Sequence, residues 1–246
     1  MSPPPWLALP APLPGPIGWY FMAFMLLLVP WAAFRTRKRF ASRDVPPRMR
    51  VMKSTLAQQA LFGGLAWLTS RLEWLWVTPV AAPSREALAG AAVVVAVAVL
   101  AMRPVWRRAV ALRQSRTMLL MPQGPKERAM WVLVSAAAGV SEELVWRGVL
   151  WGLLTRVTGN AITAAFVCSS FFALAHALQG WRSMLLIGVF SAIFHLMVWA
   201  SGTLAAAMVA HAVYDVIAGF TYAKMARETG WDVNAEVAPA EAQPAD

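Results

Sequence analysis

The amino-acid sequence predicts an all-α fold, a polytopic transmembrane helix bundle of about seven spans. Hydrophobic residues make up 59% of the 246 residues and charged residues only 14%, whereas soluble domains are nearer half apolar and a quarter charged. Apolar runs close to the roughly 20 residues that cross a bilayer recur along the chain. Lys and Arg concentrate in two loops between such runs, so the net charge of +10 indicates positive-inside topology and not nucleic-acid binding.

The first half of the chain holds a Pro-rich start and three predicted spans. Residues 1–16 carry no positive side chain, unlike the start of a secretory signal peptide, so the apolar run that follows is predicted to be retained. The three spans are predicted over 17–34, 55–70 and 87–102. Basic loops follow the first and the third span, which places the N-terminus outside. Residues 17–128 are therefore predicted to be N-terminal transmembrane helices with two basic cytoplasmic loops.

The second half of the chain is predicted to form a four-helix core over residues 129–224. Its spans are predicted over 129–154, 161–178, 184–200 and 204–224. Gly159, Gly180 and Gly202 break the helical runs between them. The polar, Ala- and Pro-rich tail, residues 225–246, is predicted to be disordered with a cytoplasmic C-terminus.

Tryptophan and cysteine placement adds two smaller expectations. Several tryptophans near predicted span ends suit the headgroup layer, with about half of them expected to be packing residues instead. They are Trp74, Trp76, Trp106, Trp131 and Trp181. The single cysteine, Cys168, lies in an apolar span and is expected to be a packing residue without a disulfide.

Ionisable side chains within the last four spans require an explanation, because each costs about 2.5–3.5 kcal/mol on insertion scales. Six of them are candidate functional residues: Glu142, Glu143, Arg147, His176, His211 and Asp215. Glu143 and Arg147 are four residues apart, so they share a helical face and can pair, while Glu142 points about 100° away. For His195, alone in its span, a hydrogen bond between helices is the expected role.

The charges of this set do not balance. Three carboxylates and one arginine leave two surplus negative charges in a medium of low dielectric constant. A protonated carboxyl, a protonated histidine or a bound divalent metal would offset them. A protonated carboxyl supplies a general acid or base for hydrolysis, and a metal supplies an activated water. The same residue types also build proton relays, so a proton-coupled transporter is an alternative.

Three motifs in order resemble a known family. They are Glu142-Glu143-x-x-x-Arg147, Phe172-x-x-x-His176 and His211-x-x-x-Asp215. Their order on membrane helices is similar to that of the CPBP family of intramembrane proteases, also called the Abi or CAAX-protease family. The resemblance covers roughly residues 129–224, which would then be the catalytic core. It implies hydrolysis of a peptide bond within the membrane.

The resemblance also implies a role for each residue. Glu142 would activate water, and His176 would help to hold that water. His211 and Asp215 would stabilise the oxyanion of the tetrahedral intermediate. Glu143 and Arg147 would be the paired supports of this helix face.

No cofactor is expected, or Zn if the reaction depends on a metal. No His-Glu-x-x-His sequence is present, yet Glu142, His176 and His211 could supply three zinc ligands. Where the prenyl endopeptidases carry asparagine in the last motif, this chain has Asp215. An ionised aspartate cannot donate to an oxyanion, so Asp215 must be protonated, orient His211 or help to hold a cation.

The predicted function is that of an endopeptidase cleaving near the membrane-associated end of a membrane-anchored protein or peptide. Its partners would be this substrate and the lipid bilayer. The Ala- and Arg-rich composition suggests a high-GC bacterium, and so a bacterial inner membrane. Bacterial members of the family that the chain resembles are linked with peptide maturation and the processing of C-terminal sorting signals, so the resemblance implies one of these contexts. A non-catalytic bacteriocin-immunity membrane protein is a further alternative.

Overall fold

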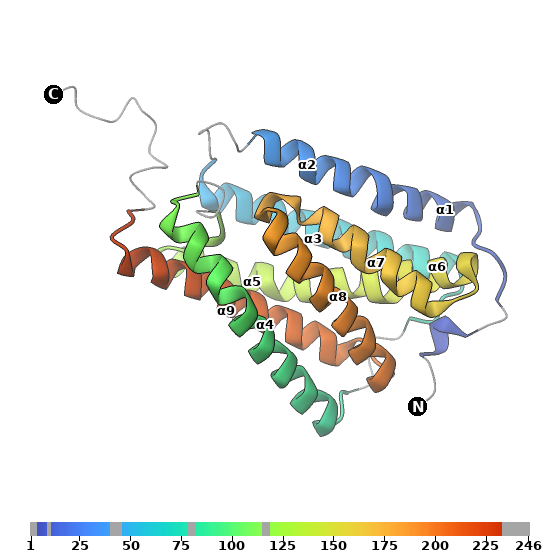
Figure 1. Cartoon of the computed structure of the whole chain (residues 1–246). Coiled ribbons are helices and arrows are strands. Elements are labelled where there is room, and N and C mark those ends of the chain that lie inside the picture. The colour runs from blue at the N-terminus through green and yellow to red at the C-terminus, as the bar shows by residue number, and fades with distance from the viewer. Residues whose placement is uncertain (1–3, 9–10, 40–45, 78–81, 115–118, 233–246) are drawn as a thin grey trace.

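The computed structural model describes residues 4–8, 11–39, 46–77, 82–114 and 119–232. All regular secondary structure in these residues is helical, and no strand occurs among them. The described residues form seven helical stretches that pack in one bundle (Figure 1). The predicted all-α transmembrane bundle is therefore confirmed.

The first three stretches come from the N-terminal half. The chain begins with a short 3-10 helix, η1 (Pro5–Leu7). The first stretch consists of three continuous elements: α1 (Pro16–Ala23), the π-helix η2 (Phe24–Leu28) and α2 (Val29–Arg39). The second and third stretches are α3 (Arg48–Leu72) and α4 (Arg85–Ala111).

The other four stretches come from the C-terminal half. Its helices are α5 (Gly124–Glu143), the π-helix η4 (Leu144–Leu150) and α6 (Trp151–Thr158), again continuous, then α7 (Ala161–Ala175), the 3-10 helix η5 (Ala177–Gln179), α8 (Trp181–Ser201) and α9 (Ala205–Glu228).

Five stretches in the described part of the chain are long and apolar enough to cross a membrane. They are Pro16–Arg39, Arg85–Ala111, Gly124–Thr158, Trp181–Ser201 and Ala205–Glu228. The other two, α3 and α7, overlap the spans predicted over 55–70 and 161–178. Helix α3 begins in basic residues and carries glutamines, and α7 has only 15 residues.

Most helices run past the predicted spans: α3 covers residues 48–72 against a predicted 55–70, and α4 covers 85–111 against 87–102. Two other boundaries also differ from their predictions. The fifth span was predicted to end at residue 178, but α7 ends at Ala175 because His176 leaves the helical conformation, with φ −94° and ψ 19°. The C-terminal tail was predicted from residue 225, but α9 continues to Glu228. Residues 233–246 of that tail, and Arg43, Asp44 and Arg116 of the basic loops, lie outside the described residues.

Helix α5 is the centre of the bundle. It packs against α3 on one side and α9 on the other, while α4 contacts both α8 and α9 (Figure 1). Gly139 permits the close approach of α5 and α9, because an added Cβ would lie 2.7 Å from the Met208 carbonyl oxygen and 2.8 Å from the Ala212 nitrogen. This approach brings the middle of α5 next to the histidine of α9.

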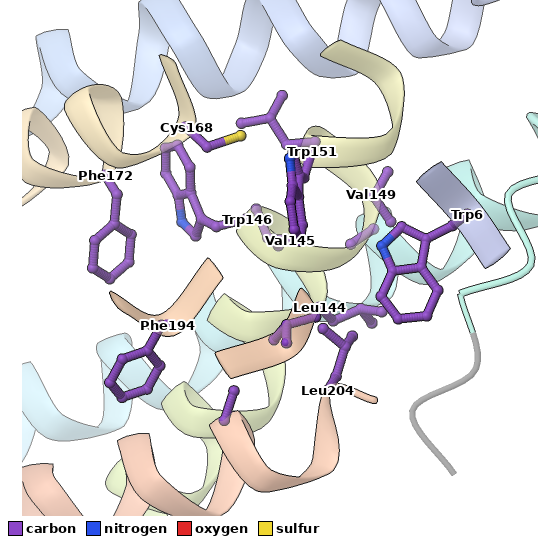
Figure 2. Close-up of a cluster of buried hydrophobic side chains, with 14 of the residues drawn as sticks. Trp6, Leu144, Val145, Trp146, Val149, Trp151, Cys168, Phe172, Phe194 and Leu204 are labelled. Atoms are coloured by element: carbon purple, nitrogen blue, oxygen red, sulfur yellow. The ribbon is translucent and has the colours of Figure 1, made fainter. Parts of the chain in front are cut away.

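A buried aromatic and aliphatic cluster fixes the segment that follows Glu143. Figure 2 shows Trp146 and Trp151 of this segment beside α7, near Cys168. The rings of Trp146 and Phe172 are 5.5 Å apart in an edge-on arrangement. Cys168 is fully buried in this cluster, which confirms its prediction as a packing residue.

The tryptophans divide between surface and core. Trp74, Trp76 and Trp181 are exposed, as expected for the headgroup layer. Trp106 is buried and packs on Tyr214 and Tyr222. A headgroup position for Trp106 is therefore wrong.

Candidate active site

The six predicted site residues come together from three helices. Glu142 and Glu143 end α5, and Arg147 lies one turn later in the π-helix η4. His176 caps the C-terminus of α7, and His211 and Asp215 lie on α9. The site therefore forms where α5 passes between α9 and the end of α7.

Glu143 and Arg147 form the predicted pair. Arg147 Nη1 donates to Glu143 Oε1 at 3.1 Å, and both side chains are almost fully buried. Arg147 Nη2 also donates to Ser191 Oγ of α8 at 2.8 Å. The guanidinium lies 4.4 Å from the centre of the Phe172 ring, a cation-π distance. The pair thus connects α5, α7 and α8.

Glu143 has a second partner that its spacing from Arg147 did not indicate. Its Oε1 lies 2.7 Å from His211 Nδ1. Because a carboxylate oxygen that already accepts from Arg147 can only accept again, His211 Nδ1 carries the proton and donates. Glu143 therefore orients His211 as well as pairing with Arg147.

His176 is oriented in the same way by a backbone group. Its Nδ1 lies 2.7 Å from the carbonyl oxygen of Phe172, and a carbonyl oxygen can only accept, so Nδ1 donates. The ring also lies against the Phe172 ring, with centres 4.4 Å apart. The Nε2 atoms of His176 and His211 are thus both left for the site.

Glu142 faces these two Nε2 atoms. Its Oε2 lies 3.9 Å from His176 Nε2 and 3.8 Å from His211 Nε2. Its other oxygen, Oε1, accepts a hydrogen bond of 2.6 Å from Gln59 Nε2 of α3. Within the described part of the chain, Glu142 Oε2 is a buried acceptor with no hydrogen-bond partner. Contacts of 3.8–3.9 Å are too long for direct hydrogen bonds and short enough for a shared water.

Asp215 lies beside His211 without orienting it. Its Oδ2 is 3.7 Å from His211 Nε2, beyond hydrogen-bond distance, whereas Glu143 holds the opposite nitrogen. The Asp215 side chain is 29% exposed, the highest value among the acidic and histidine residues here. Trp131 donates to its backbone oxygen at 2.9 Å, which ties this turn of α9 to α5.

A cavity of about 80 Å³ lies against this cluster. His176, His211 and Asp215 line it together with Glu143 and Arg147, while Glu142 is not among the lining residues. Glu142 instead faces the cavity-lining residues His176 and His211 from behind the cavity wall. The remaining wall is largely apolar and comes mainly from α4 and α8: Val95, Ala98, Met102, Ile187, Phe190 and Phe194. The volume suits a few water molecules.

Zinc held by Glu142, His176 and His211 was the metal-dependent alternative. The residue types suit a catalytic zinc site. Their facing atoms are 3.8 and 3.9 Å apart, farther than the roughly 3.4 Å between donors around a tetrahedral zinc. No group of three acidic, histidine or cysteine side chains among the described residues is arranged to hold a metal ion. The present arrangement of these three side chains does not fit a zinc ion.

His195 lies outside the cavity. It is 2% exposed, its Nδ1 lies 2.9 Å from the carbonyl oxygen of Ser191, and Ser169 Oγ of α7 is 3.4 Å away. Its ring packs edge-on against Trp151. The expected contact between helices is therefore present, although it is long.

The sequence interpretation missed Gln59 and Ser191, both in direct contact with site residues. Gln59 offered a signal, because it is a polar side chain within a predicted span and such residues need a partner. Ser191 offered little, since a serine in a membrane helix commonly bonds to its own backbone.

Comparison with known proteins identifies part of the chain. Residues 124–217 match the family model described as type II CAAX prenyl endopeptidase Rce1-like. The match begins with α5 and ends in α9 just after Asp215, so it contains all six candidate residues. Neither the curated proteins nor the solved structures give a significant match. Helices α1 to α4 lie outside the matched segment.

Proposed function

We propose that this chain, whose residues 124–217 match the Rce1-like type II CAAX prenyl endopeptidase family model, is an intramembrane endopeptidase in which Glu142 activates water. The match confirms the CPBP resemblance drawn from the three motifs. Together with five candidate membrane spans, it supports a CAAX-type protease that is an integral membrane protein.

One observation carries the proposal for Glu142. Its Oε2 faces the Nε2 atoms of His176 and His211 at 3.9 and 3.8 Å. A water shared by these atoms would donate one proton to Glu142 Oε2 and the other to His176 Nε2, whose Nδ1 is already committed as a donor. Its oxygen would then be free to attack a peptide carbonyl in the adjacent cavity.

The bonds of the reaction balance within these residues. The water oxygen bonds to the carbonyl carbon while its proton passes to Glu142. Collapse of the tetrahedral intermediate breaks the carbon–nitrogen bond, and Glu142 returns the proton to the leaving amine.

His211 and Asp215 would stabilise the oxyanion. His211 can donate from Nε2 only as an imidazolium, and the Glu143 carboxylate 2.7 Å from Nδ1 stabilises that ion. Asp215 would donate beside it in protonated form. This assignment uses Asp215 as a donor, since Glu143 already orients His211.

The substrate would be a protein or peptide with a membrane-associated end. We infer a bacterial inner membrane from the Ala- and Arg-rich composition. The two basic loops favour an N-terminus outside and a C-terminus in the cytoplasm. Processing of C-terminal sorting signals or peptide maturation fits this setting. A proton-coupled transporter and a non-catalytic immunity protein are the outcomes that the experiment must separate from it.

The test uses purified full-length protein reconstituted into liposomes. The substrates are internally quenched peptides anchored at their C-terminal end by a farnesyl group, an acyl chain or a transmembrane segment. We expect cleavage of at least one peptide, and a loss of that cleavage in Glu142→Gln. Absence of cleavage by the wild type, or equal cleavage by Glu142→Gln, would contradict the proposal.

Two further measurements address the alternatives. Proton uptake by the same liposomes without peptide cleavage would favour transport. A fall in cleavage on chelation that added zinc restores would replace the metal-free mechanism by a metal-dependent one.

A further inference from the structure

The carboxylate of Glu142 is held by a side chain from outside the family match. Gln59 lies in the middle of α3, is 6% exposed, and donates from Nε2 to Glu142 Oε1 at 2.6 Å. It is 83 residues from Glu142 in sequence. The contact is therefore made by the way α3 packs on α5, and not by local sequence.

A second hydrogen bond fixes which end of the Gln59 amide faces Glu142. Ser141 Oγ donates to Gln59 Oε1. Because the amide oxygen accepts from Ser141, the amide nitrogen must point toward the carboxylate. Adjacent residues of α5 thus bind the two ends of one amide.

The helices are close enough for this contact because of Gly63, one turn after Gln59. A Cβ added at Gly63 would lie 3.2 Å from Ser141 Cβ. A larger residue would push α3 away from the turn of α5 that carries Ser141 and Glu142.

We propose that Gln59 is a positioning residue of the hydrolytic site. It occupies Oε1 of Glu142 and so leaves Oε2 as the oxygen that faces His176 and His211. The inference rests on the proposed function of Glu142. It also means that the matched segment, residues 124–217, does not contain the whole site.

The ordinary alternative is that Gln59 only ties α3 to α5. That role would affect stability, and would leave the turnover of folded protein unchanged. A positioning role affects kcat, because a misdirected carboxylate still permits substrate binding but fails to activate water.

Gln59→Met separates these roles, because methionine keeps the length of the side chain and removes the donor. With the anchored peptide that the wild type cleaves fastest in liposomes, we expect the kcat of Gln59→Met to fall about 10- to 100-fold. Its KM should stay within about twofold of the wild-type value. Gln58→Met is the matched control, because Gln58 is the exposed neighbour on the same helix; it should leave both constants unchanged.

A second pair of variants covers the case in which Gln59→Met folds poorly. Ser141→Ala frees the amide of Gln59 to turn over, so kcat should fall by about three- to tenfold. Combined with Gln59→Met, it should add little to the loss, since both changes break one arrangement.

The results also separate this inference from the proposed function. If Glu142→Gln is inactive while Gln59→Met and Ser141→Ala both keep the wild-type kcat, the positioning role is wrong and the catalytic role of Glu142 stands. If Glu142→Gln keeps full activity, the proposed function is wrong, and the positioning role falls with it.

Discussion

Glu143 Oε1 binds both Arg147 and His211. It accepts from Arg147 at 3.1 Å and from His211 at 2.7 Å, and its side chain is fully buried. Removing the Glu143 carboxylate would leave the Arg147 guanidinium buried without this counter-charge. Glu142, by contrast, is 17% exposed and has no such cation to compensate. The two adjacent glutamates should therefore respond differently to substitution.

Glu143→Ala should destabilise the protein by about 3–5 kcal/mol, the cost of breaking a buried ion pair. Glu142→Gln should change stability by less than about 1 kcal/mol, because an amide fills the same space. Its kcat should fall about 10²- to 10⁴-fold, as expected for loss of a general base. Unfolding in mixed micelles measures the first effect, and peptide cleavage measures the second. Equal stability of the two variants would argue against the division into a support and a base.

Asp215 gives a residue-scale test of how the oxyanion is stabilised. The amide of asparagine donates a hydrogen bond without having to be protonated, as a carboxyl group must be. Asp215→Asn should therefore keep activity within about tenfold of the wild type. Asp215→Ala removes the donor and should lower kcat by about 10²- to 10³-fold. Peptide cleavage by the three proteins checks the order. Equal loss in Asn and Ala would show that the carboxylate itself is required, as a base or a cation ligand.

The π-helix η4 is the secondary-structure element that carries Arg147. It begins directly after Glu143, and π-helical turns often occur at functional sites. Trp6 of η1 donates from Nε1 to the Arg147 carbonyl oxygen at 3.2 Å, and its ring is buried against this segment (Figure 2). The start of the chain, expected only to be Pro-rich, thus supports the site segment.

Trp6→Phe should therefore destabilise the protein by about 1 kcal/mol, since it removes the donor and keeps a buried ring. Trp6→Ala should cost about 3–5 kcal/mol, because a cavity is added. Trp74→Phe is the control, since Trp74 is 73% exposed. Thermal unfolding in detergent compares the three. An effect of Trp6→Ala no larger than that of Trp74→Phe would show that η1 does not stabilise η4.

Hydropathy predicted the existence of each helix better than its ends or its partners. An apolar run of 16 to 26 residues is readable in one sequence because length and composition alone determine it. The end of α7 at His176 was not readable, since apolar residues continue to Leu178. The contact of Gln59 with Glu142 spans 83 residues and depends on how two helices pack. The i to i+4 pair Glu143–Arg147 was predictable because one helix sets its geometry.

At the scale of the whole molecule, the N-terminal helices belong to the same packing unit as the matched segment. Helix α3 lies along α5, and α4 contacts both α8 and α9 (Figure 1). Met102 of α4 lines the site cavity, and Gln59 of α3 contacts Glu142. The helices before and after residue 128 therefore pack together.

The orientation of this unit in the membrane can be tested through its cysteine usage. Cys168 is the only cysteine and is fully buried, so the wild type should not react with a membrane-impermeant maleimide. Single cysteines can therefore be introduced without first removing Cys168. Arg85 and Lys126 are suitable positions, because both are exposed and α4 lies between them.

The positive-inside rule predicts that Arg85 lies outside and Lys126 in the cytoplasm. In intact cells, Arg85→Cys should be labelled and Lys126→Cys should be labelled only after permeabilisation. The wild type should stay unlabelled under both conditions, which also checks the burial of Cys168 in the membrane. If only Lys126→Cys were labelled in intact cells, the orientation of the protein would be the opposite of the predicted one. The C-terminus of α9 would then lie outside, and substrates would have to present their membrane-associated ends from the opposite side.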